Sequence, residues 1–107
     1  MSVTEEGYAL EFLPQFEEDL REAIDYIRLT LRNPTAAGKL LDDAFDAIYE
    51  RQSAPESFEP YPSKLDREHP YYRIPVGNFI VLYVVIGNVM EVRRFIYARR
   101  NWQAWPL

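Results

Sequence analysis

Arginine and tyrosine side chains recur in the last third of this sequence, where they are the best candidates for chemistry. The residues concerned are Arg73, Arg93, Arg94, Tyr97, Arg99 and Arg100. A guanidinium group is planar, permanently charged and matched to phosphate oxygens, so several on one surface would bind a polyanion. A single arginine near a sheet edge is more often a solvated residue that discourages unwanted strand pairing. The pattern therefore predicts a phosphate-binding surface only if these side chains converge.

Other catalytic signatures are missing from the sequence. It has one histidine, His69, and no cysteine, which excludes thiol proteases, disulfides, zinc–thiolate sites and histidine-ligated metal centres. It has no glycine-rich phosphate loop, no Gly-x-Ser-x-Gly and no His-Glu-x-x-His. We therefore expect neither a metal nor a cofactor. His69 and the adjacent Glu68 are weak candidates for a general base, because a lone loop histidine is more often incidental.

One arginine and two tryptophans near the C-terminus are expected to stabilise the core. In Val89–Ala98, strict alternation places Met90, Val92, Ile96 and Ala98 on one face of a strand. Arg94 would share that apolar face, which predicts a buried, paired arginine that stabilises the fold. Trp102 and Trp105 are expected to cover the end of the core, with base stacking or partner docking as the alternative.

The composition is that of a small globular protein. The chain has 107 residues, 48% of them hydrophobic, which suits one domain spanning residues 1–107. Glu5 and Glu6 stand where a signal peptide would need positive charge. The longest apolar run, Phe79–Ile86, is far shorter than the roughly 20 residues that span a bilayer. We expect a cytoplasmic protein with no membrane contact.

The net charge of −5 hides an asymmetry between the two halves of the chain. Residues 1–50 carry four basic and twelve acidic groups, a balance of −8, whereas residues 51–107 carry eight basic and five acidic groups, a balance of +3. Ordinary solvated surfaces mix charges in this way. The alternative is an acidic helical side and a basic sheet side on one small body.

Hydrophobic periodicity predicts two helices after a short strand. The strand candidate, Tyr8–Leu13, is ended by a proline. From Gln15 to Leu31, apolar residues recur at helical spacing. Asn33 can cap a second helix with Pro34 in its first turn, and so short a link predicts an antiparallel helical hairpin. The expected buried stripe of this helix consists of Ala37, Leu40, Leu41, Ala44, Phe45, Ile48 and Tyr49.

The second half predicts a β-meander after an irregular, proline-rich loop over residues 53–70. Tyr71–Pro75 leads into Phe79–Ile86, which turns through a Gly-Asn pair into Val89–Ala98. Phe79–Ile86 is apolar on both faces and is expected to be the central strand. Helices followed by a meander indicate an α+β fold, with two N-terminal antiparallel helices packed on a small, mainly antiparallel four-stranded sheet.

Four blocks of residues, in this order and at this spacing, carry a resemblance to a known family. They are Ala23-Ile24-Asp25-Tyr26-Ile27, Asn33-Pro34-x-Ala36-Ala37, Tyr72-Arg73-Ile74-Pro75-Val76-x-Asn78-Phe79-x-Val81-x-Tyr83 and Val92-Arg93-Arg94-Phe95-Ile96-Tyr97-Ala98-Arg99-Arg100-Asn101. From about Tyr8 to Trp102, the sequence resembles the RelE/ParE superfamily of toxins from type II toxin–antitoxin systems, also called plasmid stabilisation proteins.

The resemblance implies a toxin that a cognate antitoxin keeps inactive, usually through a helical or extended segment that wraps it. Two activities occur on this fold, and the fold alone does not choose between them. RelE-like members are ribonucleases that enter the ribosomal A site and cut the translated mRNA. ParE-like members bind DNA gyrase and are not enzymes in themselves.

For mRNA cleavage, the resemblance assigns roles to particular residues. Arg73 matches the arginine that stabilises the phosphate, Arg99 and Arg100 match a basic cluster after the last strand, and Tyr97 would act as acid or orienting group. The remaining expected substrate contacts are Lys64, Arg67, Arg93 and Trp102.

The chain also departs from the RelE-like pattern. It is acidic overall, its lysine-rich stretch is reduced to Lys64 and Arg67, and Asn101 occupies a position that is often aspartate. We expect a ribosome-dependent mRNA endoribonuclease that arrests translation. A gyrase inhibitor and an inactive family member acting as a binding module are the alternatives.

Overall fold

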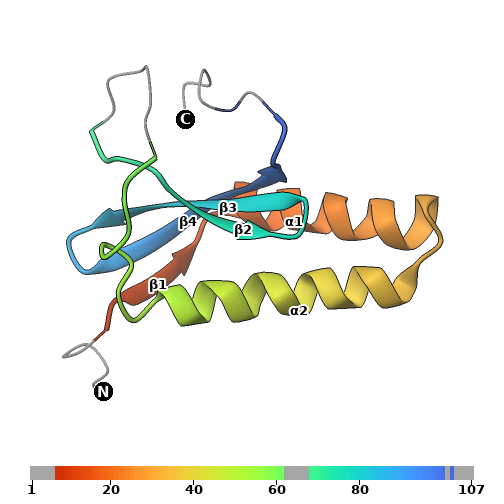
Figure 1. Cartoon of the computed structure of the whole chain (residues 1–107), viewed down its shortest axis with the longest axis horizontal. Helices are drawn as coiled ribbons and strands as arrows, with labels where there is room; N and C mark the ends of the chain where they lie inside the picture. Colours follow the sequence, from red (N-terminus) through yellow and green to blue (C-terminus); the bar gives the residue numbers. More distant parts are fainter. Residues whose placement is uncertain (1–6, 62–67, 101, 103–107) are drawn as a thin grey trace.

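The computed structural model describes residues 7–61, 68–100 and 102, in which two helices lie along one side of a four-stranded sheet (Figure 1). In chain order the elements are β1 (Ala9–Phe12), α1 (Pro14–Asp25), η2 (Tyr26–Thr30), α2 (Pro34–Arg51), β2 (Tyr72–Val76), β3 (Phe79–Ile86) and β4 (Val89–Tyr97). The α+β fold with two helices and four strands is confirmed, and each strand ends within one residue of its predicted bounds.

The sheet is mixed, with the strand order β1-β4-β3-β2. β2 pairs with β3 and β3 with β4 in the antiparallel sense, as predicted. β1 instead pairs with β4 in parallel, with Ala9 opposite Val89 and Phe12 opposite Val92. The expectation of a mainly antiparallel sheet therefore needs correction at its first strand. The direction of β1 is not encoded in its own pattern, because its partner is the last strand of the chain.

Both turns of the meander place a glycine in the left-handed backbone region. The φ angle is +58° at Gly77 and +63° at Gly87, where a residue with a Cβ atom is strained. The turn at Gly87 and Asn88 joins β3 to β4, so the predicted hairpin is confirmed. β3 has a strand on each side and is buried over residues 80–84, which confirms it as the central strand.

α2 begins as the sequence predicts. The side chain of Asn33 accepts a hydrogen bond from the Ala36 N–H at 3.1 Å, and Pro34 occupies the first turn. The predicted buried stripe is too wide, however. Leu41 and Tyr49 are 38% and 55% exposed, because they flank the part of the stripe that faces the sheet.

The first predicted helix, Gln15–Leu31, is divided in the structure. α1 ends at Asp25, and the π-helical turn η2 follows it. The Leu31 N–H bonds to the Tyr26 carbonyl at 3.0 Å, five residues back, which widens the turn. Leu31 is consequently 54% exposed, although the helical spacing placed it on the apolar side.

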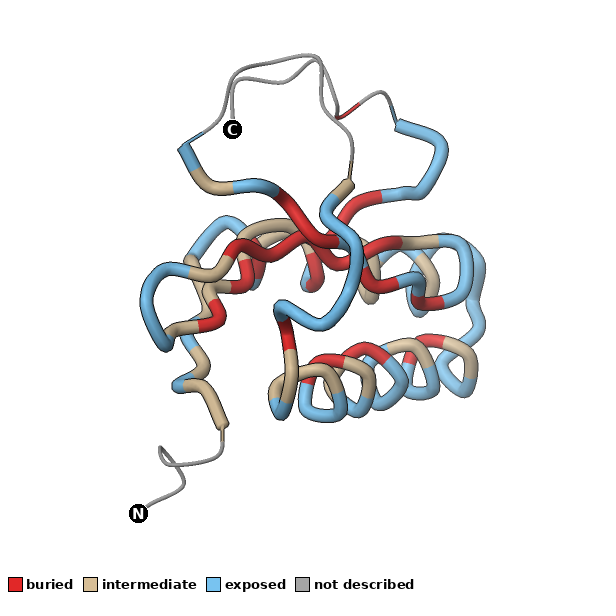
Figure 2. Tube along the Cα trace, turned by 60° about the vertical axis from the view of Figure 1, so that its left-hand side comes forward, coloured by how far each residue is buried: buried red, intermediate tan, exposed pale blue. Residues whose placement is uncertain are grey.

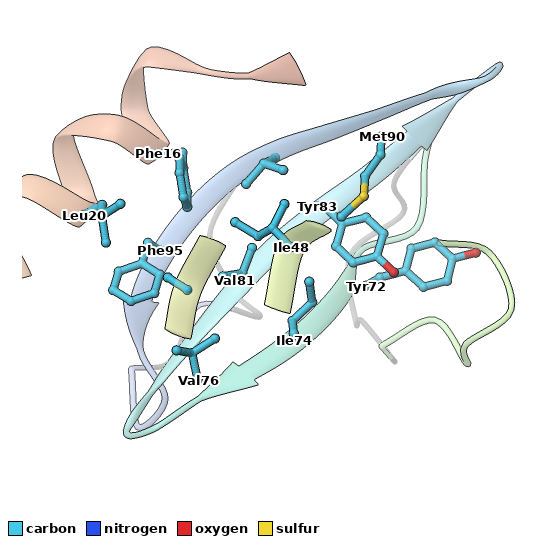
Figure 3. Close-up of a cluster of buried hydrophobic side chains, with 12 residues drawn as sticks. Phe16, Leu20, Ile48, Tyr72, Ile74, Val76, Val81, Tyr83, Met90 and Phe95 are labelled. Carbon is cyan, nitrogen blue, oxygen red and sulfur yellow. The ribbon is translucent and has the colours of Figure 1, made fainter. Parts of the chain in front are cut away.

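The sheet separates two hydrophobic clusters. The side chains that face the helices, on what we call the helix face, are Tyr72, Ile74, Val76, Val81, Tyr83, Met90, Val92 and Phe95, packed against Phe16, Leu20, Ala44 and Ile48 of the helices (Figure 3). The opposite side, the far face, carries Tyr71, Ile80, Leu82, Val84 and Ile96, with Trp102 and the partly buried Tyr61. Because both faces of the sheet are covered at its centre, residues 80–84 of β3 are buried without interruption, whereas the outer sides of the helices are exposed (Figure 2).

β4 contains a bulge at Arg93. Leu82 of β3 pairs with Arg94 and Tyr83 pairs with Val92, which leaves Arg93 between two pairs. A bulge inserts one extra residue, so the alternation of side chains changes phase across it.

The bulge corrects the predicted faces of the last strand. Met90 and Val92 lie on the helix face as a pair, but the next residue there is Phe95, and Ile96 lies on the far face. The expectation that Met90, Val92, Ile96 and Ala98 share one face is therefore wrong. Alternation had no means of locating the extra residue.

Candidate functional site

Arg94 forms an ion pair with Asp19 of α1. Its Nε donates to Asp19 Oδ2 at 2.6 Å, and its Nη2 donates to Oδ1 at 3.2 Å. Asp19 Oδ2 also accepts the backbone N–H of Phe95 at 3.1 Å. The side chains of Arg94 and Asp19 are only 19% and 8% exposed. The prediction that Arg94 is a paired arginine of the fold is confirmed, while its partner Asp19 was not predicted.

Arg93, at the bulge, binds two neighbours. Its Nε donates to Glu91 Oε1 at 2.7 Å, and its Nη1 donates to the Tyr71 hydroxyl at 3.2 Å. Burial alone lowers the pKa of the guanidinium, but the hydrogen bonds with Tyr71 and Glu91 outweigh it, and the pKa is raised above its ordinary value. Arg93 is therefore charged, and Glu91 offsets that charge. The predicted RNA contact of Arg93 would have to compete with this carboxylate.

Arg73 extends from β2 on the far face. It lies opposite Leu82, which is buried there, and its guanidinium carbon is 4.5 Å from the centre of the Tyr61 ring. A guanidinium over an aromatic face is attracted by the ring quadrupole. The residue is exposed, and no ion pair is recorded for it within the described part of the chain. The positive charge of Arg73 is therefore accessible to a phosphate group.

Trp102 closes the far face. It is 1% exposed, and its ring centre lies 4.7 Å from that of Tyr61 and 6.0 Å from that of Tyr71. Its predicted role in covering the core is confirmed, whereas Trp105, for which the same role was predicted, lies outside the described residues. A substrate-binding role would need an exposed ring, which this burial does not provide.

Tyr97, Arg99 and Arg100 are exposed at the end of β4. Tyr97 and Arg100 line a groove between β4 and the α1–η2 segment, which we call the α1–β4 groove. Other lining residues of this groove are Glu22, Tyr26, Leu31, Phe79 and Phe95. Tyr97 meets Phe79 edge to face, with 5.7 Å between ring centres.

The structure does not bring the predicted catalytic residues together. Side chains directly opposite in an antiparallel pair lie on the same face of the sheet. Arg73 is opposite Leu82 on the far face, whereas Tyr97 is opposite Phe79, which packs on the helix face. Tyr97 and Arg100 thus share a groove, while Arg73 lies on the other side of the sheet.

The remaining predicted candidates do not form a site in the described part of the chain. Lys64 and Arg67 lie outside the described residues. His69 Nε2 is 3.8 Å from Glu68 Oε2, and the Glu68 side chain is 89% exposed, as in an ordinary surface pair. Residues 7–61, 68–100 and 102 contain no cluster of acidic or histidine side chains that could hold a metal ion. In the same residues, no helix has the length and apolar character needed to cross a membrane.

Sequence reasoning missed a polar network at the end of α2. Arg51 Nη1 donates to the Tyr83 hydroxyl at 2.9 Å, and this hydroxyl donates to the Pro55 carbonyl at 2.7 Å. Arg51 also lies over the ring of Phe58, 3.5 Å from its centre. The network anchors the loop after α2 to the central strand. Nothing in the apolar run of β3 marked Tyr83 as its centre.

A second groove runs between the two helices. Its lining is largely apolar, with Glu17 and Arg21 among residues that also include Phe12, Phe16, Leu20, Ile24, Leu41 and Phe45. We call it the interhelical groove.

Comparison with known proteins identifies relatives of this architecture. Residues 10–102 match the family described as ParE toxin of type II toxin-antitoxin system, parDE. No curated protein sequence matches the chain significantly. Among solved structures, a chain from the chromosomal ParDE system of P. aeruginosa superposes with a TM-score of 0.69 at 18% identity, covering 86% of this chain and 97% of that one.

A second similar structure comes from the archaeal RelE-RelB complex of Pyrococcus horikoshii OT3. It superposes with a TM-score of 0.50 at 17% identity, covering 87% of this chain and 97% of that one. At these identities the two structures support the fold, whereas the family match spans most of the sequence. The chain therefore belongs to the ParE toxin family of type II toxin–antitoxin systems.

Proposed function

We propose that this chain is a toxin that acts by binding DNA gyrase, and that a cognate antitoxin neutralises it. The observation that carries the proposal is the separation of the predicted catalytic side chains onto opposite faces of the sheet. The family match to ParE toxins points in the same direction, because the gyrase-binding members of the superfamily are ParE-like.

The chemistry of RNA cleavage makes demands that this arrangement meets poorly. A general acid or base must reach the proton it transfers within hydrogen-bonding distance, and cationic groups must surround the same phosphate. Arg73 and Tyr97 cannot both approach one phosphate across the sheet. Arg93 and Arg94 already bind Glu91 and Asp19. Binding to another protein does not require these side chains to lie around one phosphate.

The surface offers what a protein partner needs. The interhelical groove is mainly apolar, and large apolar side chains are exposed on the helical hairpin, among them Tyr26 at 55% and Leu29 at 61%. Exposed apolar patches support recognition of a protein more than of a polyanion. An antitoxin segment and a gyrase subunit would both find apolar contact area here.

Ribosome-dependent mRNA cleavage is the second candidate, and one observation favours it. Tyr97 and Arg100 line the same groove, so a proton donor and a cation lie near each other at the end of β4. Under this candidate, Arg73 would contact RNA elsewhere and would not stabilise the cleaved phosphate.

The two candidates are separated by adding the purified chain to two reconstituted reactions. With gyrase, ATP and relaxed plasmid, we expect loss of supercoiling and gyrase-dependent double-strand breaks. In a cell-free translation reaction, we expect intact mRNA. Cuts in translated mRNA that Tyr97→Phe or Arg100→Ala abolishes, together with undiminished gyrase activity, would instead establish the nuclease.

A further inference from the structure

The loop that follows α2 passes from the helix face to the far face of the sheet and lies there beside the start of β2 (Figure 1). Phe58, Glu59, Pro60 and Tyr61 of this loop and Arg73 of β2 line a pocket of about 300 Å³, which we call the α2–β2 pocket. Pockets for small ligands have volumes of roughly 300–1,000 Å³, so this one suits a ligand with a single ring system. It is separate from both grooves described above.

Arg51 holds the Phe58 wall of the pocket in place. The Arg51 guanidinium covers one face of the Phe58 ring, with its central carbon 3.5 Å from the ring centre. The same guanidinium is tied to the sheet, because its Nη1 donates to the Tyr83 hydroxyl at 2.9 Å and to the Arg73 carbonyl at 3.4 Å. Phe58 is nevertheless 48% exposed. The opposite face of its ring is therefore open, and a flat ligand can stack on it.

The far-face cluster holds the Tyr61 wall in place. The Tyr61 N–H donates to the Tyr71 carbonyl at 2.7 Å, and the Tyr61 ring centre lies 4.7 Å from that of Trp102. The Arg73 guanidinium lies over the Tyr61 ring, 4.5 Å from its centre. Contacts that exist in the free protein do not have to be formed on binding, which favours affinity. The pocket is thus preformed, with Arg73 positioned by Tyr61.

The pocket contains one acid and one base that do not pair with each other. Glu59 and Arg73 are both exposed, and no ion pair is recorded for either within the described part of the chain. Their charges cancel, so the lining as a whole attracts neither a polyanion nor a polycation. A ligand that binds both must present hydrogen-bond donors to Glu59 and an anionic group to Arg73.

Guanine nucleotides carry these groups on one molecule with a flat ring system. The N1–H and N2–H groups of guanine lie side by side and can both donate to one carboxylate, while the phosphate can accept from a guanidinium. Adenine and cytosine place a bare acceptor nitrogen beside their amino group, which a carboxylate repels, and uracil has one N–H between two carbonyl oxygens. A fully apolar ligand would leave both charges of the pocket without a partner.

We propose that the α2–β2 pocket binds a guanine nucleotide. The base stacks on the open face of Phe58, Glu59 accepts its N1–H and N2–H groups, and Arg73 binds the phosphate. No bond of the ligand is made or broken. A free mononucleotide and a guanine within single-stranded nucleic acid present the same groups. The proposal goes beyond the proposed function, because it depends neither on gyrase nor on the antitoxin.

Titration of the full-length chain, followed by calorimetry and NMR, tests the proposal. We expect GMP to bind about tenfold more tightly than AMP, because guanine alone donates twice to Glu59. GMP should also bind about tenfold more tightly than guanosine, which lacks the phosphate. On addition of GMP, the resonances of Phe58 and Glu59 should shift, whereas those of Leu29 in η2 should not.

A short oligothymidylate with a single guanine distinguishes the two sources of the ligand. It should bind more tightly than GMP if the pocket takes single-stranded nucleic acid, because neighbouring phosphates and bases add contacts. It should bind no more tightly than GMP if the pocket takes the mononucleotide. Either result supports the pocket, provided that the same oligonucleotide without guanine binds about tenfold more weakly.

Matched variants assign each group of the ligand to its side chain. Glu59→Gln should remove most of the preference for GMP over AMP, whereas Glu50→Gln, at an exposed carboxylate outside the pocket, should keep it. Phe58→Ala should weaken GMP and guanosine alike by about tenfold. Tyr49→Ala, at an aromatic residue that is 55% exposed and outside the pocket, should weaken neither. Arg73→Gln should weaken GMP and leave guanosine unchanged.

Three results would overturn the proposal. They are equal affinity of the unaltered chain for GMP and AMP, resonance shifts confined to residues outside the pocket, and no saturable binding of GMP or of the guanine oligonucleotide. If Phe58→Ala loses the circular dichroism of the folded protein, its effect on binding is structural. The variants of Glu59 and Arg73 then decide, because both change only exposed side chains.

Discussion

Replacing Asp19 with alanine should destabilise the protein far more than the loss of any other single carboxylate on α1. Its carboxylate binds the Arg94 guanidinium twice and accepts the Phe95 N–H, and it is 8% exposed. Asp19→Ala would leave a largely enclosed arginine charge and a strand N–H without a partner. Breaking a buried ion pair from one side costs about 3–5 kcal/mol. Because Arg94 is 19% exposed and can be partly hydrated, we expect a loss of about 3 kcal/mol.

Urea and thermal unfolding followed by circular dichroism measure this loss. For a chain of this size, about 3 kcal/mol corresponds to a fall of roughly 12 °C in the midpoint of thermal unfolding. The matched control is Glu18→Ala. Glu18 pairs with Arg21 on the same helix, but their side chains are 44% and 64% exposed, so the loss should stay below about 0.5 kcal/mol.

Two further variants identify the cause of the Asp19 effect. Asp19→Asn keeps an acceptor for the Phe95 N–H but removes the charge, so its stability should lie between those of the wild type and Asp19→Ala. Combining Asp19→Ala with Arg94→Met should recover part of the loss, because no arginine charge is then left unpaired. If Asp19→Ala and Glu18→Ala prove equally mild, the edge contact does not stabilise the sheet as argued.

Three other predictions concern the frame of the fold. Asn33→Ala removes the side-chain cap of α2 and should cost about 1 kcal/mol in urea unfolding; an unchanged midpoint would mean that the cap contributes nothing. Gly87→Ala meets no atom within 4 Å but forces a Cβ atom to a φ of +63°, so it should cost about 1 kcal/mol, and a stabilised variant would contradict the turn geometry. Burial raises the pKa of Tyr83 against the opposing hydrogen bond from Arg51, so this phenol should ionise late in an absorbance titration. The folded state then holds the phenolic proton more tightly than the unfolded chain, and the free energy of unfolding should fall as pH rises from about 10 through the folded pKa. The pKa values of Tyr8 and Tyr72 are raised as well, so Tyr83→Phe should reduce the late-titrating absorbance by one phenol, and an unchanged amplitude would assign that component to the other two.

Much of the architecture could be predicted from local patterns. Helical spacing located both helices, the Asn33-Pro34 pair located the start of α2, and Gly87-Asn88 located the hairpin. These features depend on neighbouring residues, whose propensities act within a turn or two. The π-helical turn at Tyr26–Thr30 was missed because it changes the helical period without a glycine or proline to mark it.

The candidate site was less predictable than the fold. The sequence showed that arginines and tyrosines recur near the end of the chain, but one extra residue at Arg93 changed the phase of β4 beyond it. Whether a side chain faces the helices or the far face depends on that phase. Strict alternation along β4 would have placed Tyr97 on the same face as Arg73. The extra residue at Arg93 instead moves Tyr97 to the helix face.

The sequence by itself determined the family, the two helices, the meander and the paired character of Arg94, since each follows from residues close together or from their order. Only the tertiary structure decided that β1 runs parallel to β4, that Asp19 is the partner of Arg94, and that Arg73 and Tyr97 lie on opposite faces. Those relations join residues distant in the chain. Their geometry arises from the packing of the helices on the sheet, which no local pattern contains.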